Sequence, residues 1–336
     1  MVMRIFVTVV LAILVFPLSV RAQGRCDRAC LEGIANQYLQ ALAARDPKKA
    51  PLASDIKYTE NGVRLLPGEG KWLTVSAEGT FKLHIADQTA GQIVTFVTMR
   101  ENGVPFVMSS RLRVNGSRQI TEAETILSNS EGAAKGIESR PPRAAYLRAT
   151  LPADRVSRNE LVRVANMYFS GMQLNDGKGN YPFADDCHRF ENGGDTTNAA
   201  PRKPGDTRPD PKTATSYSAM WTCREQFESG MLHFVSKIRD RRYIAVDEER
   251  GLVVANAFFD HEASQMSRNY TLPDGRKISN GGPARTWTWM ISELFKVEKG
   301  LLHEIDAFLV EVPYGMNSGW SSFEDGRSDR IQFPLK

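Results

Sequence analysis

The side chains best able to move protons near neutral pH are histidines, acids and tyrosines in the second half of the chain. His188 and His261 stand where an internal repeat, described below, has a lysine and a glutamate in its first copy. Asp306 lies beside apolar residues on a predicted strand, and Tyr168 lies on a predicted helix. Acid–base catalysis by these four residues is one interpretation. A surface histidine, a solvated carboxylate and a tyrosine packed in the core are the structural alternatives.

The candidates for substrate binding are polar or aromatic: Arg189, Glu191, Asn192, Trp287, Trp289 and Tyr314. Trp287 and Trp289 fall on one face of a predicted strand, because side chains alternate between the faces. They could form the wall of an apolar pocket or an ordinary core. Arg189 could hold an anionic group or pair with a neighbouring aspartate. Aromatic walls with a few polar groups would suit a small aromatic or polyketide-like molecule.

The common motifs of cofactor and metal chemistry are missing from the sequence. There is no Gly-x-Gly-x-x-Gly after a strand, no phosphate-binding loop, no His-Glu-x-x-His and no Gly-x-Ser-x-Gly. We therefore expect any chemistry to proceed without a cofactor and without a metal.

An internal repeat indicates how the candidate residues are positioned. Residues 51–62 and 182–193 align without a gap and share six of twelve positions, including a closing Glu-Asn-Gly. Further along, residues 120–127 align with residues 302–309. Matches in this order indicate one structural unit used twice. Because Glu-Asn-Gly recurs in both copies, a turn or strand-edge role is favoured for it over a pocket-lining role.

Each unit is predicted to begin with a helix and to continue as strands. Apolar residues at helical spacing predict helices over 31–44 and 157–174, the second with Ser157 and Glu160 at capping-box spacing. A further helix is predicted over 223–238 in the second unit. Runs rich in β-branched and aromatic residues follow, joined by turns such as Asn115-Gly116. Helices followed by a meander of strands predict an α+β fold with antiparallel sheets.

Composition and the repeat also predict the domain boundaries. A basic residue, an apolar run too short to cross a membrane and a Val-Arg-Ala site predict a signal peptide at 1–22. A first domain is expected at 23–128 and a second at 155–312, separated by a Gly- and Pro-containing linker at 129–154. The tail at 313–336 has no counterpart in the first copy, and we expect it to fold across or beside the second unit, with Trp320 covering apolar surface. The mature chain is expected to be periplasmic or secreted.

All four cysteines lie beyond the predicted signal peptide, in a compartment that allows disulfides to form. Cys187 and Cys223 flank an insertion, and we expect them to pair. Cys26 and Cys30 are four residues apart at the start of a helix, so they can pair only if the first turn is irregular. The net charge of +4, with both signs well mixed, does not argue for a nucleic-acid partner.

The order of these elements resembles a known superfamily. A helix, an acidic-aromatic motif, long hairpins and a last strand reading Gly-Leu-Leu-His-Glu-Ile-Asp-Ala-Phe resemble the nuclear transport factor 2-like superfamily, which includes SnoaL-like cyclases, ketosteroid isomerases and scytalone dehydratase. The resemblance covers nearly the whole mature chain. It implies two tandem cone-shaped domains, each with N-terminal helices packed on a curved antiparallel sheet. It also implies His, Asp, Glu or Tyr chemistry inside a cone, although this fold hosts many functions.

These observations favour an exported, cofactor-independent lyase, dehydratase or isomerase that acts by acid–base chemistry on a small molecule, with its site in the second unit. The alternative is a non-catalytic small-molecule-binding or assembly protein. A small molecule is the expected partner, with no nucleic acid and no membrane after signal removal. The sequence also allows a homo-oligomer.

Overall fold

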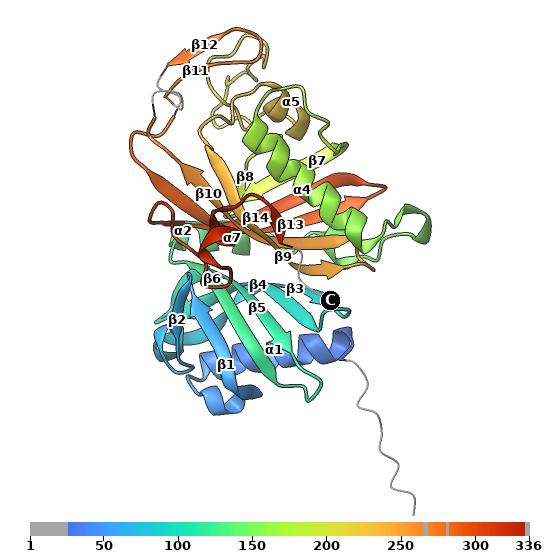
Figure 1. The fold of residues 1–336 in the computed structure, drawn as a ribbon, viewed down its shortest axis with the longest axis vertical. Helices are drawn as coiled ribbons and strands as arrows, with labels where there is room; N and C mark the ends of the chain where they lie inside the picture. Colours follow the sequence, from blue (N-terminus) through green and yellow to red (C-terminus); the bar gives the residue numbers. More distant parts are fainter. Residues whose placement is uncertain (1–25, 265–267, 280–281, 333–336) are drawn as a thin grey trace, which may run out of the picture.

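The computed structural model of the protein describes residues 26–264, 268–279 and 282–332, so the predicted signal peptide at 1–22 lies outside the described residues. Two large sheets dominate the fold (Figure 1). The first sheet has the strand order β2–β1–β6–β5–β4–β3, and its strands are β1 Leu52–Glu60, β2 Val63–Leu65, β3 Val75–Asp87, β4 Gln92–Glu101, β5 Val104–Val114 and β6 Ile120–Ser128. The second has the order β15–β9–β10–β13–β14–β7–β8, and its strands are β7 Phe183–Glu191, β8 Gly194–Asp195, β9 Lys237–Asp247, β10 Leu252–His261, β13 Trp287–Glu298, β14 Leu301–Val312 and β15 Ile331–Gln332.

The helices are fewer and mostly short. Those described are α1 Arg28–Ala43, α2 Glu131–Glu138, α3 Ala144–Leu147, α4 Arg158–Leu174, α5 Cys223–Glu228 and α7 Phe323–Arg327, and a small hairpin joins β11 Asn269–Thr271 to β12 Lys277–Ser279. The predicted helices at 31–44 and 157–174 are confirmed as α1 and α4. The helix predicted at 223–238 is too long, because α5 ends at Glu228 and β9 begins at Lys237. Ser157 caps α4 by accepting a hydrogen bond from the backbone N–H of Glu160, as the sequence predicts.

The predicted fold class is wrong. We expected two cone-shaped domains with several helices packed on a curved antiparallel sheet. The structure instead has six- and seven-stranded mixed sheets, in which β1 pairs in parallel with β6 and β7 pairs in parallel with β14. A single long helix lies on the outer face of each sheet, and the inner faces of the two sheets pack against each other.

This layering explains why the strands are so apolar. The first sheet packs one face on α1, through residues such as Leu31 and Ile93, and the second packs one face on α4, through residues such as Phe169 and Phe295. Phe96 and Phe308, whose ring centroids are 4.6 Å apart, belong to the layer between the sheets. Strands covered on both faces lose the alternation of polar and apolar residues. Accordingly, every residue of β10 is buried.

The repeat seen in the sequence is present in the structure. Read from β8, the second sheet repeats the strand order of the first sheet read from β2, and β15 is an addition at its far edge. Asn61 and Asn192 both have a positive φ, which asparagine tolerates. The Asn61 side chain exchanges two hydrogen bonds with the backbone of Leu127, and that of Asn192 does the same with Leu309. The asparagine of the recurring Glu-Asn-Gly is therefore a strand-end clamp, as expected for a turn or strand-edge role.

The two units, α1 with the first sheet and α4 with the second, meet with approximate twofold symmetry. Ser109 on β5 and Ser292 on β13 occupy equivalent positions, and their hydroxyl oxygens lie 2.8 Å apart across the interface. Strand β6 packs on its equivalent β14, and β3 packs on its equivalent β9. Contacts between equivalent residues are the signature of a twofold axis.

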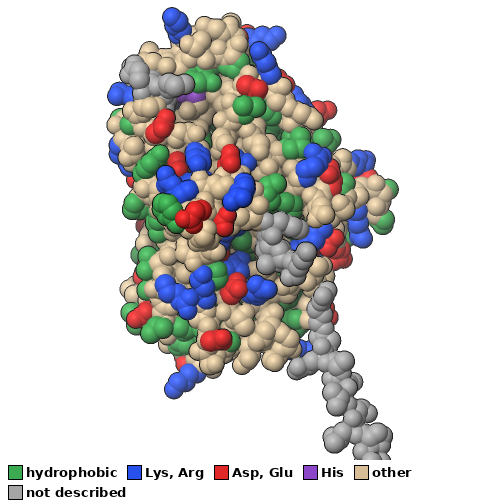
Figure 2. Space-filling model, in the orientation of Figure 1, with side chains coloured by type: hydrophobic (Ala, Val, Ile, Leu, Met, Phe, Trp, Pro, Cys, Tyr) green, Lys and Arg blue, Asp and Glu red, His purple; other side chains and the backbone are tan. Residues whose placement is uncertain are grey.

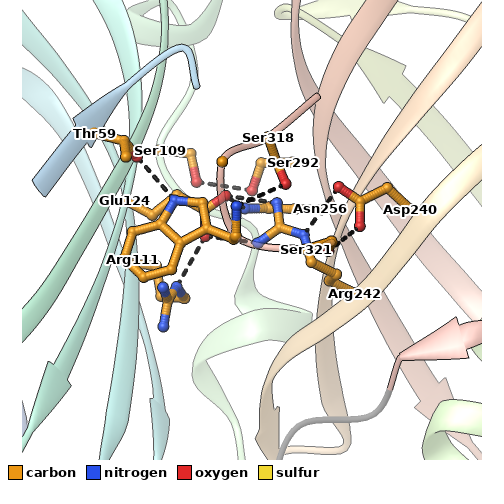
Figure 3. A network of polar contacts seen from close by, with 12 residues as sticks. Thr59, Ser109, Arg111, Glu124, Asp240, Arg242, Asn256, Ser292, Ser318 and Ser321 are labelled. Atoms are coloured by element: carbon orange, nitrogen blue, oxygen red, sulfur yellow. Dashed lines mark hydrogen bonds and ion pairs between the residues drawn. The ribbon is translucent and has the colours of Figure 1, made fainter. Parts of the chain in front are cut away.

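A buried ion-pair network lies in this interface (Figure 3). Glu124 of the first unit accepts hydrogen bonds from Arg242 of the second unit at 2.6 Å and from Arg111 of its own unit at 3.0 Å. The Asn256 amide donates a further bond to Glu124 at 3.1 Å. All four side chains are buried, so the network fixes the contact between the units through groups that depend on one another.

The C-terminal tail lies beside the second unit, as expected, but it also reaches the first unit, where Trp320 contacts polar side chains instead of the apolar surface that we expected it to cover. The indole N–H of Trp320 donates to Thr59 of the first unit at 2.9 Å, and the Lys57 ammonium lies 4.0 Å from the Trp320 ring centroid. The same tail is held to the second unit, where Arg239 donates to the carbonyl of Met316 and β15 pairs with β9. The tail therefore connects both units.

The predicted Cys187–Cys223 disulfide is confirmed. Cys26, which precedes the N-cap residue Asp27, pairs with Cys30 in the first turn of α1. Two disulfides suit an oxidising, extracellular environment.

Removing the Cys187–Cys223 bridge with paired serine substitutions should lower the free energy of unfolding by about 3–4 kcal/mol, because this disulfide closes the longer loop and so restricts the unfolded chain more. Removing Cys26–Cys30 in the same way is the matched control and should cost about 2 kcal/mol. Urea unfolding of both variants measures the difference. An equal or larger loss at Cys26–Cys30 would contradict the prediction.

Candidate functional site

A cavity of about 70 Å³ lies in the second unit, between α4 and the outer face of the seven-stranded sheet. Its polar lining is provided by Tyr168, Arg189, Glu191, Thr196, Tyr217 and Glu293. Its apolar lining includes Phe234, Phe259 and Trp289. Polar groups that converge within an aromatic wall are typical of sites for small molecules.

Glu293 is the most unusual of these groups. It lies in the middle of β13, and its cross-strand neighbours are Ala255 and Ala307, whose small side chains leave space beside the carboxyl group. Glu293 is 2 % exposed, and its Oε2 atom has no hydrogen-bond partner among the described residues. Burial raises the pKa of Glu293 to about 8, although the charge of Arg189 and a hydrogen bond from Tyr168 act in the opposite direction. The carboxyl group is therefore largely protonated at pH 7.

Arg189 faces the same cavity and is 3 % exposed. Its Nη1 donates to Oε1 of Gln226 at 2.7 Å, and its Nη2 donates to Oε1 of Glu191 at 2.9 Å. Its Nε has no partner in the described part of the chain. Burial lowers the pKa of Arg189, but the surrounding tyrosines and glutamates raise it by more, so the guanidinium group stays cationic.

Three buried polar atoms on this lining lack a partner among residues 26–264, 268–279 and 282–332: Arg189 Nε, Thr196 Oγ1 and Glu293 Oε2. An unsatisfied buried polar atom lowers the stability of a folded protein by about 1–3 kcal/mol, so three of them in one cavity are strongly destabilising. They provide an N–H donor, a hydroxyl group and a protonated carboxyl group. This set can bind the oxygen atoms of a small molecule.

The first unit does not repeat this arrangement. At the positions equivalent to Arg189 and Glu293 it has Tyr58 and Ser110. In the first unit, the region between α1 and the sheet contains Trp72. Trp72 is buried and packs edge-on against Tyr38, with 5.5 Å between the ring centroids. A cation, a protonated acid and free space therefore come together in the second unit.

A second, more open cavity of about 390 Å³ adjoins the first and shares Phe234 with it. His261 and Trp287 line it, and their rings stack at 3.7 Å between centroids with an angle of 2° between planes. His261 and Trp287 are paired residues on β10 and β13, which explains their overlap. Burial lowers the pKa of His261 to about 4, so its ring is neutral at pH 7.

The structure brings six of the predicted site residues together. Tyr168, Arg189, Glu191 and Trp289 line the inner cavity. His261 and Trp287 line the outer one.

Four predicted residues lie elsewhere. Asp306 points to the other face of the sheet, where it lines a separate cavity of about 60 Å³ beside Arg143 of the linker. His188 lies 3.5 Å from Asp195, outside both cavities of the site. Asn192 forms the strand-end clamp, and Tyr314 belongs to the tail and is 43 % exposed.

Sequence reasoning missed Glu293, Thr196, Tyr217 and Phe234. The sequence does contain a signal for Glu293, because it is an acid in the middle of a predicted strand, at a position where the first copy has a serine. Thr196 and Tyr217 lie in and beside the polar insertion, whose lack of periodicity predicted only a surface loop. Phe234 resembles any other apolar residue of its segment.

Comparison with known proteins adds little about activity. No curated protein matches the chain. In the described ranges no group of three or more His, Cys, Asp or Glu side chains is arranged to hold a metal ion, and none of their helices has the length and apolar character needed to cross a membrane. The resemblance to the nuclear transport factor 2-like superfamily stays a prediction. What is found is that residues 154–309, which contain both cavities, are similar to a family described as a domain of unknown function (DUF8021).

Proposed function

We propose that the second unit is a cofactor-independent acid–base catalyst, a lyase, dehydratase or isomerase, that acts on a small aromatic carbonyl compound. The observation that supports this most directly is Glu293, a buried and protonated carboxyl group with one oxygen unpartnered among the described residues and facing a cavity beside a buried arginine. Strongly perturbed acids in cavities are frequent at active sites.

The proposed roles follow from the hydrogen-bonding capacity of each group. A carbonyl oxygen placed between Glu293 and Arg189 would accept hydrogen bonds from the carboxyl O–H and from the Nε–H. Both donors would strengthen as negative charge develops on that oxygen, which is how an oxyanion site lowers a barrier. The aromatic wall, including Trp289, would hold the ring of the substrate.

The proposed step is the isomerisation of a ketone through its enol. The Glu191 carboxylate takes a proton from the carbon next to the carbonyl group, the electrons of that C–H bond form a C=C bond, and Glu293 gives its proton to the carbonyl oxygen. Return of a proton from Glu191 to a different carbon, and of the O–H proton to Glu293, restores the carbonyl group. Glu191 takes the role of base because Asp306 and His261 do not line the inner cavity.

The proposed setting of this activity is periplasmic or secreted. The two disulfides support it, because they persist in oxidising compartments.

A β,γ-unsaturated aryl ketone, 1-phenylbut-3-en-1-one, tests the proposal. The wild-type protein should convert it to the conjugated isomer in D2O with deuterium incorporation, followed by proton NMR. Glu293→Gln should slow the reaction by roughly 10²–10⁴-fold, because glutamine cannot transfer the proton. Ser110→Ala, at the equivalent position of the first unit, is the matched control and should react like the wild type.

Equal rates for Glu293→Gln and the wild-type protein would refute the catalytic role. Tight binding of the ketone without conversion or exchange would instead support the non-catalytic binding protein.

A further inference from the structure

The two cavities lie along one face of one strand. Side chains of β13 alternate, so Trp287, Trp289, Ile291 and Glu293 point to the same side. Glu293, Ile291 and Trp289 line the inner cavity, and Trp287 lines the outer one. At about 3.3 Å per residue, this face extends roughly 20 Å from Glu293 to Trp287. A molecule whose carbonyl group lies at Glu293 can therefore extend outward past Trp289.

The outer cavity is built from ring faces. His261 stacks on Trp287, and Phe234 lies nearly parallel to His261, with 6.2 Å between ring centroids and 13° between planes. Trp289 meets the His261 ring edge-on at 4.6 Å. Phe234 lines both cavities, and Trp289 lines the inner one while touching the His261 ring of the outer one, so an aromatic ligand that passes from one cavity to the other would contact aromatic rings along its length.

The outer cavity also presents an unused hydrogen-bonding group. His261 is 1 % exposed, and neither of its ring nitrogens has a hydrogen-bond partner within the described residues. A neutral imidazole offers one donor and one acceptor, which a phenolic hydroxyl group can match. Arg285, the cation on this lining, is already paired with Glu311 at 2.7 Å. An uncharged partner therefore fits better than an anion.

We infer that the outer cavity is a second aromatic subsite of the same site, and that the ligand is an elongated, uncharged molecule of two rings whose outer ring carries a hydroxyl group. In this arrangement the carbonyl end lies at Glu293 and Arg189, and the hydroxylated ring lies against Trp287 and His261. This inference rests on the proposed function, because that function places the carbonyl end.

Three probes with the same long chain separate the two subsites: 1-phenyldecan-1-one, which has the carbonyl end and the chain alone; 1,10-diphenyldecan-1-one, which adds a second ring; and 10-(4-hydroxyphenyl)-1-phenyldecan-1-one, which adds the hydroxyl group. The long chain lets the second ring reach Trp287 from a carbonyl group at Glu293. Titration calorimetry on the oxidised mature protein should show affinity rising in that order. Trp287→Ala should weaken both two-ring probes about tenfold or more and leave 1-phenyldecan-1-one unchanged. His261→Phe keeps a ring but no nitrogen, so it should remove the advantage of the hydroxylated probe over the plain two-ring probe.

The variants also separate the two proposals. Glu293→Leu, which removes the hydrogen-bond donor that glutamine would keep, should weaken all three probes, because each carries the carbonyl group. If 1-phenyldecan-1-one binds through Glu293 but the two-ring probes bind no more tightly, the second subsite is wrong and the proposed function stands. If the affinity of the two-ring probes depends on Trp287 but not on Glu293, the outer subsite stands and the proposed function fails. If the wild-type protein binds none of the probes up to their solubility limits, both are overturned.

Discussion

Replacing Glu124 by alanine should lower the free energy of unfolding by about 3–5 kcal/mol, a large fraction of the stability of a typical protein. The Glu124 side chain is 0 % exposed and neutralises Arg242 and Arg111, which are themselves buried. Its removal leaves two guanidinium groups facing each other inside the interface between the units. Urea unfolding monitored by fluorescence measures the loss.

Glu122→Ala is the matched control, because Glu122 lies on the same strand and also pairs with Arg111 but is partly exposed. A loss of about 1 kcal/mol or less is expected there. Similar losses in the free energy of unfolding for Glu122 and Glu124 would show that the buried ion pairs stabilise the protein no more than the partly exposed one does.

The same network should determine acid sensitivity. Burial opposes ionisation of Glu124, but Arg242 and Arg111 outweigh it and lower its pKa to about 2. A carboxyl group whose pKa is depressed on folding stabilises the protein above its ordinary pKa of about 4.5. That contribution is lost as the pH falls from about 4.5 towards 2. The Glu124→Ala variant should therefore lose less stability over this range than the wild-type protein does.

Glu293→Gln should stabilise the protein, and increasingly so as the pH rises. The pKa of Glu293 is raised from 4.5 to about 8 on folding, so the folded state binds more protons than the unfolded state between these values. The wild-type protein therefore loses stability as the pH rises through this range, whereas glutamine does not titrate. At about 1.4 kcal/mol per pKa unit, the advantage of glutamine should reach on the order of 3 kcal/mol by pH 7.

Unfolding free energies at pH 5, 6, 7 and 8 measure this difference. The Ser110→Ala variant, at the equivalent position of the first unit, should differ from the wild type by a constant amount. A constant difference for Glu293→Gln as well would mean that Glu293 is ionised in the folded protein, and the acid role proposed for it would be lost.

The repeat was readable in the sequence because it is carried by identities in order, and it correctly indicated two units with one strand order. The way in which the strands pair could not be predicted from the sequence. Alternation and β-branched content predict a strand but not the direction of its neighbour, so the parallel pairing of β7 with β14 was missed. The contact of Trp320 with the first unit was missed for a similar reason, because nothing near Trp320 in the sequence indicates a bond to Thr59.

The error at Asp306 has a local cause. Strict alternation places Leu302 on the same face as Asp306, but the register shifts between Lys296 and Val297, where β14 has an extra residue. Leu302 consequently packs towards α4, while Asp306 faces the other way. One extra residue reverses the face of all that follows. The buried acid beside the cavity is therefore Glu293, on the neighbouring strand.

The contact between Ser109 and Ser292 has an evolutionary consequence. In a symmetric pair of separate chains, any substitution on the axis appears on both sides at once, so every change must suit both copies. Joining the copies in one polypeptide removes that restriction, because each position can vary alone. Tyr58 and Arg189 occupy equivalent positions in the two copies, and they differ in this way. One half could retain a filled core while the other acquired a buried cation and an open cavity.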